Sequence, residues 1–450
     1  MTPKPKLNLF DLTMIVIGLV IGMGIFRTSK EAAAAALTPS IFFGAWIVGG
    51  IVAFCGALTY AEIGSRYPVT GGYYKIFAYA YHPSVAFAVN CIILISNAAS
   101  LSGVALIGAQ YIAPILFESG ASDVVKAFIA MAAIFIFYGV NLMGLRMSSK
   151  TQNVLMIIKI SMLLLLISAI FFPQYYSTAP IKEVDLKTLD LSVILLSFGV
   201  ALKATSFTYG GYQQTINFGD EIINPQKNIP RGIFTGILVI VALYLAVSYS
   251  YYRVIGFEEL KLDHPNSPGI ASMIMEKMFG AAGRYASSII LFIAVLAYVN
   301  VLLLSNPRVM FAMSEDGILP KAFKKKDEKR DVLTVSLTVF AAICIVVLFF
   351  AKTFDQILSF TIFLDSIGMA TSAATIFILR KRTKHLDGTG IYSMKLYPIL
   401  PIIFIATYIF VGTVIAITNP QYAVIGTSVF IAFLIIYFLA KKFSKSTPST

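Results

Sequence analysis

Long apolar runs separated by short polar loops dominate the 450-residue sequence. Most runs exceed the ~20 residues that a helix needs to cross a bilayer. They are continuously hydrophobic, unlike the alternating ten-residue segments that are typical of a membrane β-barrel. We therefore predict an all-α polytopic membrane protein. The predicted spans cover approximately 9–36, 40–64, 76–116, 123–145, 151–172, 191–219, 231–256, 283–311, 332–351, 355–380, 397–418 and 421–440.

Composition agrees with a protein in a lipid bilayer, since 58% of the residues are hydrophobic and only 13% are charged. The net charge of +13 could indicate nucleic-acid binding. However, the basic clusters at 321–330 and 380–384 fall in alternate loops, whereas 182–190 and 257–264 are mixed or acidic. Lys and Arg gather in this way in cytoplasmic loops. We therefore predict two cytoplasmic termini and no nucleic-acid partner.

The sequence predicts neither a cleavable signal peptide nor a disulfide framework. Lys4 and Lys6 lead straight into a full-length span, so we expect no cleavable signal peptide. Cys55, Cys91 and Cys344 all lie inside apolar runs. They are interpreted as packing residues, and no disulfide framework is expected.

Glycines interrupt the first apolar run. Gly18, Gly22 and Gly24 stand near its centre, where each lowers helix propensity by about 1 kcal/mol relative to Ala. Broken backbone at membrane depth is tolerated only where protein buries it or where it lines a cavity. The N–H groups of the second half-helix would suit an anion such as a carboxylate. Close helix packing through small residues is the alternative interpretation.

A second interruption, SFTYGGYQQ, follows at 206–214. Two broken helices in corresponding halves are the best sequence indication of a transporter binding site. Spans 9–172 and 191–380 would then be two inverted five-helix repeats, with 397–440 as an accessory pair in a single domain, 1–450. Carbonyl groups near Phe207 and Gly210 could accept from an ammonium group, so the expected substrate is a zwitterion.

Lys159 stands among apolar residues of the fifth span. A lysine at the bilayer centre costs at least ~2.5 kcal/mol and therefore suggests a function. Its ammonium could replace a sodium ion or exchange a proton. Alternatively, the long side chain could extend to the edge of the membrane.

Three further charged residues lie inside or beside the predicted spans. Asp365 is the matching anion in the tenth span, and Lys203 lies one helical turn before Phe207. Each could pair with the other, contact a substrate side chain or act as a gate. Arg27, near the outer end of the first interruption, could form a cationic vestibule or a salt bridge. We find no motif of an enzyme, a metal site or a nucleotide site, so we predict no catalysis and no cofactor.

Four stretches resemble a known family. They are GMGIFRTS at 22–29, AEIGSRYPVTGGYYKIFAYAYHPSVAF at 61–87, FTYGGYQQTINFGDEIINPQKNIPRGI at 207–233 and NPRVMFAMSEDGILP at 306–320. Together they resemble the amino acid–polyamine–organocation superfamily of secondary transporters. The resemblance is closest to its L-type amino acid transporter-like and bacterial amino acid permease members.

The resemblance implies a LeuT-type fold that works by alternating access. The implied function is sodium-independent transport of neutral L-amino acids across a bacterial inner membrane, as an exchanger or a proton symporter. A carrier of polyamines or cationic amino acids is the alternative. By motif position, the substrate-binding residues would be Val20, Ile21, Gly22, Met23, Gly24, Phe207, Gly210, Tyr212 and Gln213.

The resemblance also assigns roles within this set. The substrate carboxylate would meet the N–H groups of Met23 and Gly24. The amine would meet carbonyl groups near Val20, Ile21, Phe207 and Gly210, and Phe207 would be an aromatic gate. Lys159 would occupy the place of a sodium ion and link the first, fifth and eighth spans. Asn300 and Ser305 would be polar groups of the eighth span near this cation site.

Several positions depart from the family pattern. Met23 replaces a usual Ser, Tyr212 stands where Trp is frequent, and Asp365 stands where Asn is frequent. The animal L-type carriers bind a glycoprotein subunit through a cysteine between the third and fourth spans. The corresponding segment here, FESGASD at 117–123, has none, so we expect no disulfide-linked heavy subunit.

Overall fold

The computed structural model describes residues 6–22, 24–117, 121–182, 184–262, 269–350 and 354–445, with side chains described outside 350–362 and 440–445. Every named element in these ranges is a helix. The long helices are α1 (Leu9–Val20), α2 (Gly24–Ala35), α3 (Pro39–Arg66), α4 (Gly72–Ala80), α5 (Pro83–Leu116), α6 (Asp123–Leu142), α7 (Leu145–Ser168), α8 (Leu191–Tyr209), α9 (Pro225–Val254), α11 (Ile270–Glu315), α12 (Thr334–Phe350), α13 (Phe354–Arg382), α14 (Ile399–Thr418) and α15 (Pro420–Lys445). Shorter helices include α10 (Phe257–Lys261), η4 (Tyr212–Asn217) and η5 (Gly219–Glu221).

The described part of the chain contains 11 helical segments that are long and apolar enough to cross a membrane. The predicted span at 332–351 corresponds to α12, which is apolar but only 17 residues long. The count of twelve spans therefore stays a prediction.

Two predicted spans have different boundaries in the structure. The span predicted at 76–116 is divided into α4 and α5, because His82 caps a new helix that has Pro83 at its first position. The eighth predicted span, 283–311, is part of the 46-residue α11. Gly280, with a φ of 65°, marks a kink inside α11.

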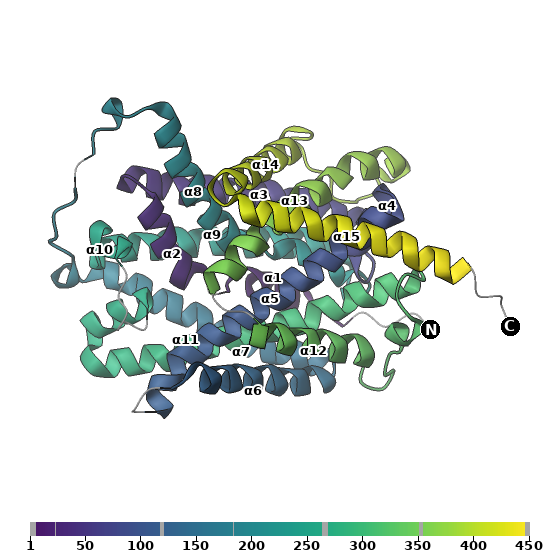
Figure 1. The fold of residues 1–450 in the computed structure, drawn as a ribbon, viewed down its shortest axis with the longest axis horizontal. Helices are drawn as coiled ribbons and strands as arrows, with labels where there is room; N and C mark the ends of the chain where they lie inside the picture. Colours follow the sequence, from purple (N-terminus) through teal and green to yellow (C-terminus); the bar gives the residue numbers. More distant parts are fainter. Residues whose placement is uncertain are drawn as a thin grey trace.

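The helices pack in two groups. The four-helix group consists of α5, α6, α11 and α12, which contact one another in every pairing. The α1 group consists of α1, α3, α8 and α9, in which α9 contacts α1 and α3, and α3 contacts α8. Figure 1 shows α6 and α12 along one edge of the bundle and α14 near the opposite edge, with α15 crossing the front of the bundle. Helix α7 contacts members of both groups, α1 and α9 on one side and α6 and α11 on the other.

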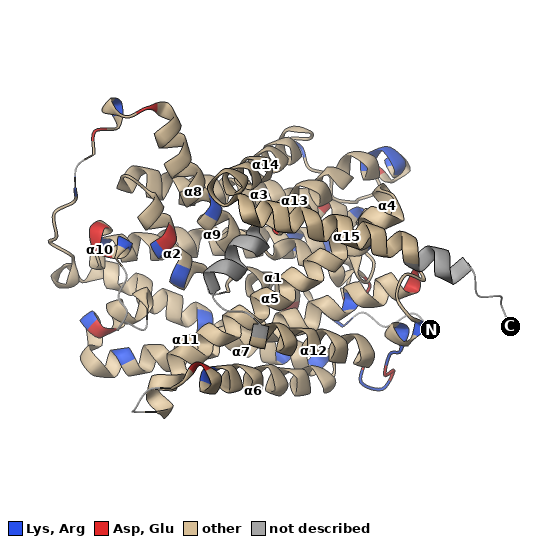
Figure 2. Ribbon diagram, in the orientation of Figure 1, with Lys and Arg blue, Asp and Glu red and all other residues tan. Residues whose placement is uncertain are grey.

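Charged residues gather at the two ends of the bundle, and the middle contains few of them (Figure 2). At the end where α1 begins, the segment before α1 pairs with the last residue of η5 and the residues directly after it. The N–H groups of Lys6 and Leu7 donate to the carbonyl oxygen of Glu221 at 2.8 and 2.9 Å. Lys6 also forms an ion pair with Asp331. We call this region the Lys6 end.

A buried ion pair connects η5 to α11 of the four-helix group at the Lys6 end. The carboxylate of Glu221 accepts from Nε and Nη2 of Arg308 on α11, at 2.8 and 2.7 Å. The Arg308 guanidinium also stacks over the Phe218 ring, 4.4 Å from its centroid. Both charged residues are less than 10% exposed, so this end of the bundle is closed around them.

Candidate substrate-binding site

The first interruption lies between α1 and α2. Helix α1 begins with a capping box formed by Asn8 and Asp11 and ends at Val20. Helix α2 begins at Gly24, Ile21 and Gly22 are not helical, and Met23 lies outside the described residues.

The carbonyl groups at the end of α1 have partners on other helices. The Ile21 oxygen accepts from Nζ of Lys159 at 2.5 Å, and the Val20 oxygen accepts from the hydroxyl of Tyr244 at 3.2 Å. Helix α7 and helix α9 thus hold the end of α1 in place.

The second interruption lies between α8 and η4, and it touches the first. Gly211 has a φ of 117°, and a Cβ there would lie 2.1 Å from the carbonyl oxygen of Leu19. Only glycine combines this backbone conformation with so close an approach. On the other side of the junction, the hydroxyl of Thr208 contacts that of Thr28 on α2. A Cβ at Gly24 would lie 2.8 Å from the Thr208 side chain.

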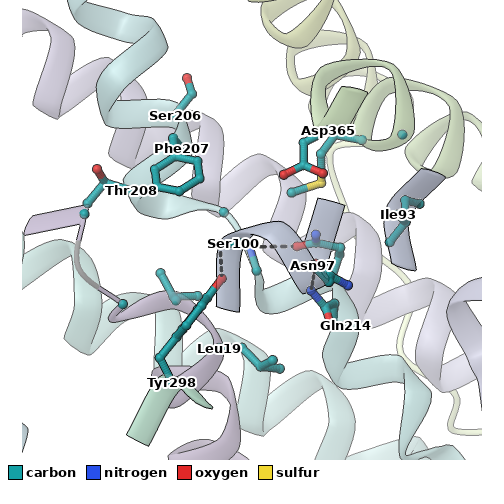
Figure 3. Close-up of a pocket in the computed structure, with 18 of the residues that line it drawn as sticks. Leu19, Ile93, Asn97, Ser100, Ser206, Phe207, Thr208, Gln214, Tyr298 and Asp365 are labelled. Atoms are coloured by element: carbon teal, nitrogen blue, oxygen red, sulfur yellow. Dashed lines mark hydrogen bonds between the residues drawn. The ribbon is translucent and has the colours of Figure 1, made fainter. Parts of the chain in front are cut away.

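One cavity lies between these interruptions and α5, α11 and α13 (Figure 3). Phe207 is half-buried in its wall, and Asp365 approaches it from α13. The predicted site residues that line this cavity are Val20, Gly22, Gly24, Phe207, Gly210, Gln213 and Asp365.

Two of the predicted substrate-binding residues do not line the cavity. The Ile21 carbonyl is turned to Lys159, as described above. Tyr212 is 1% exposed, and its ring packs edge-on against Tyr60 of α3 with 6.0 Å between the centroids. A Cβ at Gly56 of α3 would lie 2.0 Å from the Tyr212 hydroxyl, so this side chain points toward α3.

The predicted cation-site residues are distributed over three places. Lys159 is fully buried and contacts the end of α1. Asn300 donates instead to Oε1 of Gln152 at 2.8 Å and accepts from Asn141 at 3.0 Å. Ser305 accepts from Nδ2 of Asn217 at 3.2 Å, which connects α11 to η4. In the described chain, neither Asn300 nor Ser305 is hydrogen-bonded to Lys159.

The predicted gating residues also occupy different places. Asp365 accepts from Oγ of Ser96 on α5 at 3.2 Å, inside the cavity wall. Lys203 lies close enough to Glu31 on α2 for the two charges to interact, and it does not line the cavity. Arg27 lies on α2 within electrostatic range of Tyr111. The roles of these three residues stay predictions.

Several residues that line the cavity were not predicted from the sequence. The hydroxyl groups of Ser100 and Tyr298 are 2.9 Å apart, and Nε2 of Gln214 donates to Oδ1 of Asn97 at 3.1 Å (Figure 3). A signal was present for α5, because Ser96, Asn97 and Ser100 recur at helical spacing within an apolar run. The other missed lining residues are Leu19, Tyr73, Ile93, Val104, Ser206, Thr208, Gly211, Gly368, Met369 and Tyr408.

A family model described as "Amino acid permease" matches residues 7–440. The chain belongs to the amino acid permease family. This match confirms the predicted resemblance and, together with the apolar helices, the predicted all-α polytopic membrane fold. The permease is therefore a multi-pass membrane protein of a transporter family, which points away from an enzymatic function.

Curated relatives cover nearly the whole permease. It is 28% identical to the serine/threonine exchanger SteT of Bacillus subtilis (strain 168), over 98% of this chain and 97% of the relative. It is 26% identical to the branched-chain amino acid permease BcaP of the same organism, over 98% and 94% of the two chains. It is 23% identical to the human large neutral amino acids transporter small subunit 2, over 97% and 80%.

Proposed function

We propose that this permease carries neutral L-amino acids across the cytoplasmic membrane by sodium-independent alternating access. The observation that carries the proposal is the cavity between the two helix interruptions, where backbone groups and polar side chains meet. The names of the relatives, an exchanger for serine and threonine, a branched-chain permease and a large neutral carrier, favour neutral substrates. Transport is by exchange or by proton symport.

The two interruptions suit the two charges of an amino acid. The substrate carboxylate is proposed to lie at the start of α2, by Met23 and Gly24, because the first N–H groups of a helix have no partners within it and favour an anion. The ammonium is proposed to lie by the carbonyl groups of Phe207 and Gly210. The Phe207 oxygen already accepts from the Gly210 N–H at 3.1 Å, and a carbonyl has a second lone pair for the substrate.

Lys159 is proposed to take the part that a sodium ion would have. Its ammonium is buried and contacts the end of α1, next to the cavity. In an exchanger this ammonium stays charged throughout the cycle, whereas in a proton symporter it releases and regains a proton. Asn300 and Ser305 are proposed to support this region by fixing α11 against α7 and η4.

Alternating access requires the α1 group to move against the four-helix group. We propose that the Lys6 end faces the cytoplasm, so that the Glu221–Arg308 pair opens when the cavity is released inward. Both termini would then be cytoplasmic, as the loop charges predict. The repeats 9–172 and 191–380, with 397–440 as accessory helices, are the corresponding proposal for the domain organisation.

Two statements about partners belong to the same proposal. The substrate is a small molecule, joined by a proton in the symport version. No disulfide-linked heavy subunit is expected, because 117–123 contains no cysteine. A carrier of cationic amino acids or polyamines is the second candidate, and the specific observation that favours it is the Asp365 carboxylate in the cavity wall.

Counterflow in proteoliposomes without sodium tests the function. Vesicles are loaded in turn with each common amino acid and with putrescine, and labelled alanine, serine and leucine are offered outside. We expect uptake to be accelerated only by internal neutral amino acids. Uptake into empty vesicles that follows an imposed proton gradient would identify a symporter. The absence of uptake for every amino acid would reject the proposal.

A further inference from the structure

Three side-chain amides form a relay that ends at the cavity. Nδ2 of Asn306 donates to the carbonyl oxygen of Leu302, one turn earlier on α11, at 2.9 Å. A peptide carbonyl can only accept, so this hydrogen bond fixes which end of the Asn306 amide is the oxygen. That oxygen accepts from Nδ2 of Asn97 at 2.6 Å. Oδ1 of Asn97 in turn accepts from Nε2 of Gln214 at 3.1 Å.

The relay leaves one end of the Gln214 amide without a partner. The Gln214 nitrogen donates to Asn97, so the Gln214 oxygen is the last group of the relay and has no partner within it. Gln214 lines the cavity and is 5% exposed, and Oε1 has no hydrogen-bond partner among the described residues. A buried acceptor without a partner costs free energy, so a ligand that donates to it is favoured over one that does not.

Three other polar groups of the cavity wall or beside it are already paired. The hydroxyl of Ser100 is paired with that of Tyr298, and Ser96 donates to Asp365. Gln213, the neighbour of Gln214, accepts from the N–H of Gly211 at 2.9 Å. The oxygen of Gln214 therefore differs from these groups in having unused capacity.

We infer that the Gln214 oxygen accepts a hydrogen bond from the side chain of the substrate and selects amino acids with a hydroxyl group, such as serine and threonine. The inference rests on the proposed function. The group that donates to Gln214 is the side-chain hydroxyl of the substrate and not its α-ammonium. The proposed function places the α-ammonium by the carbonyl groups of the second interruption. In Figure 3, Gln214 and Asn97 lie on one side of the view and Thr208 on the other. Thr208 contacts the start of α2.

Threonine and valine provide the sharpest test, because they have nearly the same shape and differ in one hydroxyl. The inhibition constants of both for serine counterflow are measured in the same vesicles, so their ratio does not depend on the amount of folded protein. A site that hydrogen-bonds a hydroxyl discriminates strongly against the analogue that lacks it. The wild-type protein should prefer threonine by about tenfold or more.

Three variants separate recognition from structure. Gln214→Met keeps the length of the side chain and removes the acceptor, and should bring the ratio close to one. Asn306→Ala removes the far end of the relay without touching the cavity and should lower the ratio in part, which identifies Asn306 as a positioning residue. Thr215→Val is the control, because Thr215 is also buried with an unpartnered oxygen on η4 but does not line the cavity. Its ratio should equal that of the wild type.

Several outcomes would overturn the inference. A wild-type protein without preference for threonine over valine would do so, even if no variant folded. An equal loss of affinity for threonine, valine and alanine in Gln214→Met would place the contact at the substrate backbone. An unchanged ratio in Gln214→Met would remove Gln214 from recognition. By contrast, a wild-type protein that takes up no amino acid would reject the proposed function itself.

Discussion

The ammonium of Lys159 donates to the carbonyl oxygen of Ile21 at 2.5 Å, at the point where α1 ends. The C-terminal end of a helix carries a partial negative charge, so it stabilises a cation placed there. Ile21 follows directly on Val20, which lines the cavity. The buried Lys159 side chain is therefore bonded to the residue next to the wall of the proposed substrate site, and we expect the two places to influence each other.

Replacing Lys159 by alanine should strongly reduce transport. A hydrogen bond to a charged group contributes about 1.5–3 kcal/mol, so we expect counterflow at least about tenfold below that of the wild type. Lys150→Ala is the matched control, since Lys150 is on the same helix but exposed. Intact counterflow in Lys159→Ala vesicles would remove Lys159 from the mechanism.

The sequence identified the places where the chain is unusual. Glycines in apolar runs and isolated charges are local features, and they directed attention to Gly22, Gly24, Phe207, Lys159 and Asp365. In the structure these residues lie in or beside one region. Local pattern was sufficient here, because lipid leaves few reasons for such residues other than contact with a cavity or with each other.

The sequence could not distinguish which side chains after Gly211 face the cavity. Tyr212 was predicted to line it and Gln214 was not, yet Tyr212 packs on α3 and Gln214 lines the cavity. The segment forms a 3-10 helix, with three residues per turn instead of 3.6, so the faces differ from those of an α-helix. The amide relay from Asn306 likewise joins residues 209 and 117 positions apart, which no local pattern contains.

Gly211→Ala should prevent the two interruptions from packing. The added Cβ would meet the Leu19 carbonyl oxygen at 2.1 Å, and the φ of 117° is strained for alanine. Backbone strain of this kind costs of the order of 1–3 kcal/mol before the clash is counted. We expect a lower melting temperature of the purified protein and no counterflow.

Gly139→Ala is the control for the glycine variant. A Cβ at Gly139, on α6, would meet no atom within 4 Å. Alanine favours a helix over glycine by about 1 kcal/mol, so this variant should be as stable as the wild type or slightly more stable. Equal melting temperatures of the Gly139→Ala and Gly211→Ala variants would show that the junction tolerates a side chain.

Asp331 should make the stability of the Lys6 end depend on pH. Burial raises the pKa of its carboxyl group, but the ion pairs with Lys326 and Lys6 outweigh this and hold the pKa below its usual value of 3.8. A pKa lowered by folding means that the ionised form stabilises the folded state. This contribution is fully present above about pH 4 and is lost as the pH falls further.

The melting temperature measured between pH 6 and pH 3 tests the role of Asp331. Asp331→Asn removes the charge, so its melting temperature should lie below that of the wild type at pH 6, and the difference should shrink toward pH 3. Partly exposed ion pairs contribute of the order of 1 kcal/mol or less, so the difference will be small. Asp190→Asn, at an exposed position whose side chain makes no capping bond, is the control. A difference that is constant with pH would mean that the carboxylate charge does not stabilise this end.

Asp365 separates the two candidate substrate classes. If the permease carries neutral amino acids, arginine and putrescine should not slow serine counterflow, because the carboxylate is engaged by Ser96 and serves to shape the cavity. Asp365→Asn should then retain serine transport within about fivefold of the wild type, since an amide oxygen still accepts from Ser96 and a neutral hydrogen bond differs from a charged one by roughly 1 kcal/mol. Asp123→Asn, at an exposed site at the start of α6, controls for the loss of one acidic residue. Inhibition by arginine in the wild type that disappears in Asp365→Asn would instead identify the carboxylate as the partner of a cationic side chain and favour the second candidate.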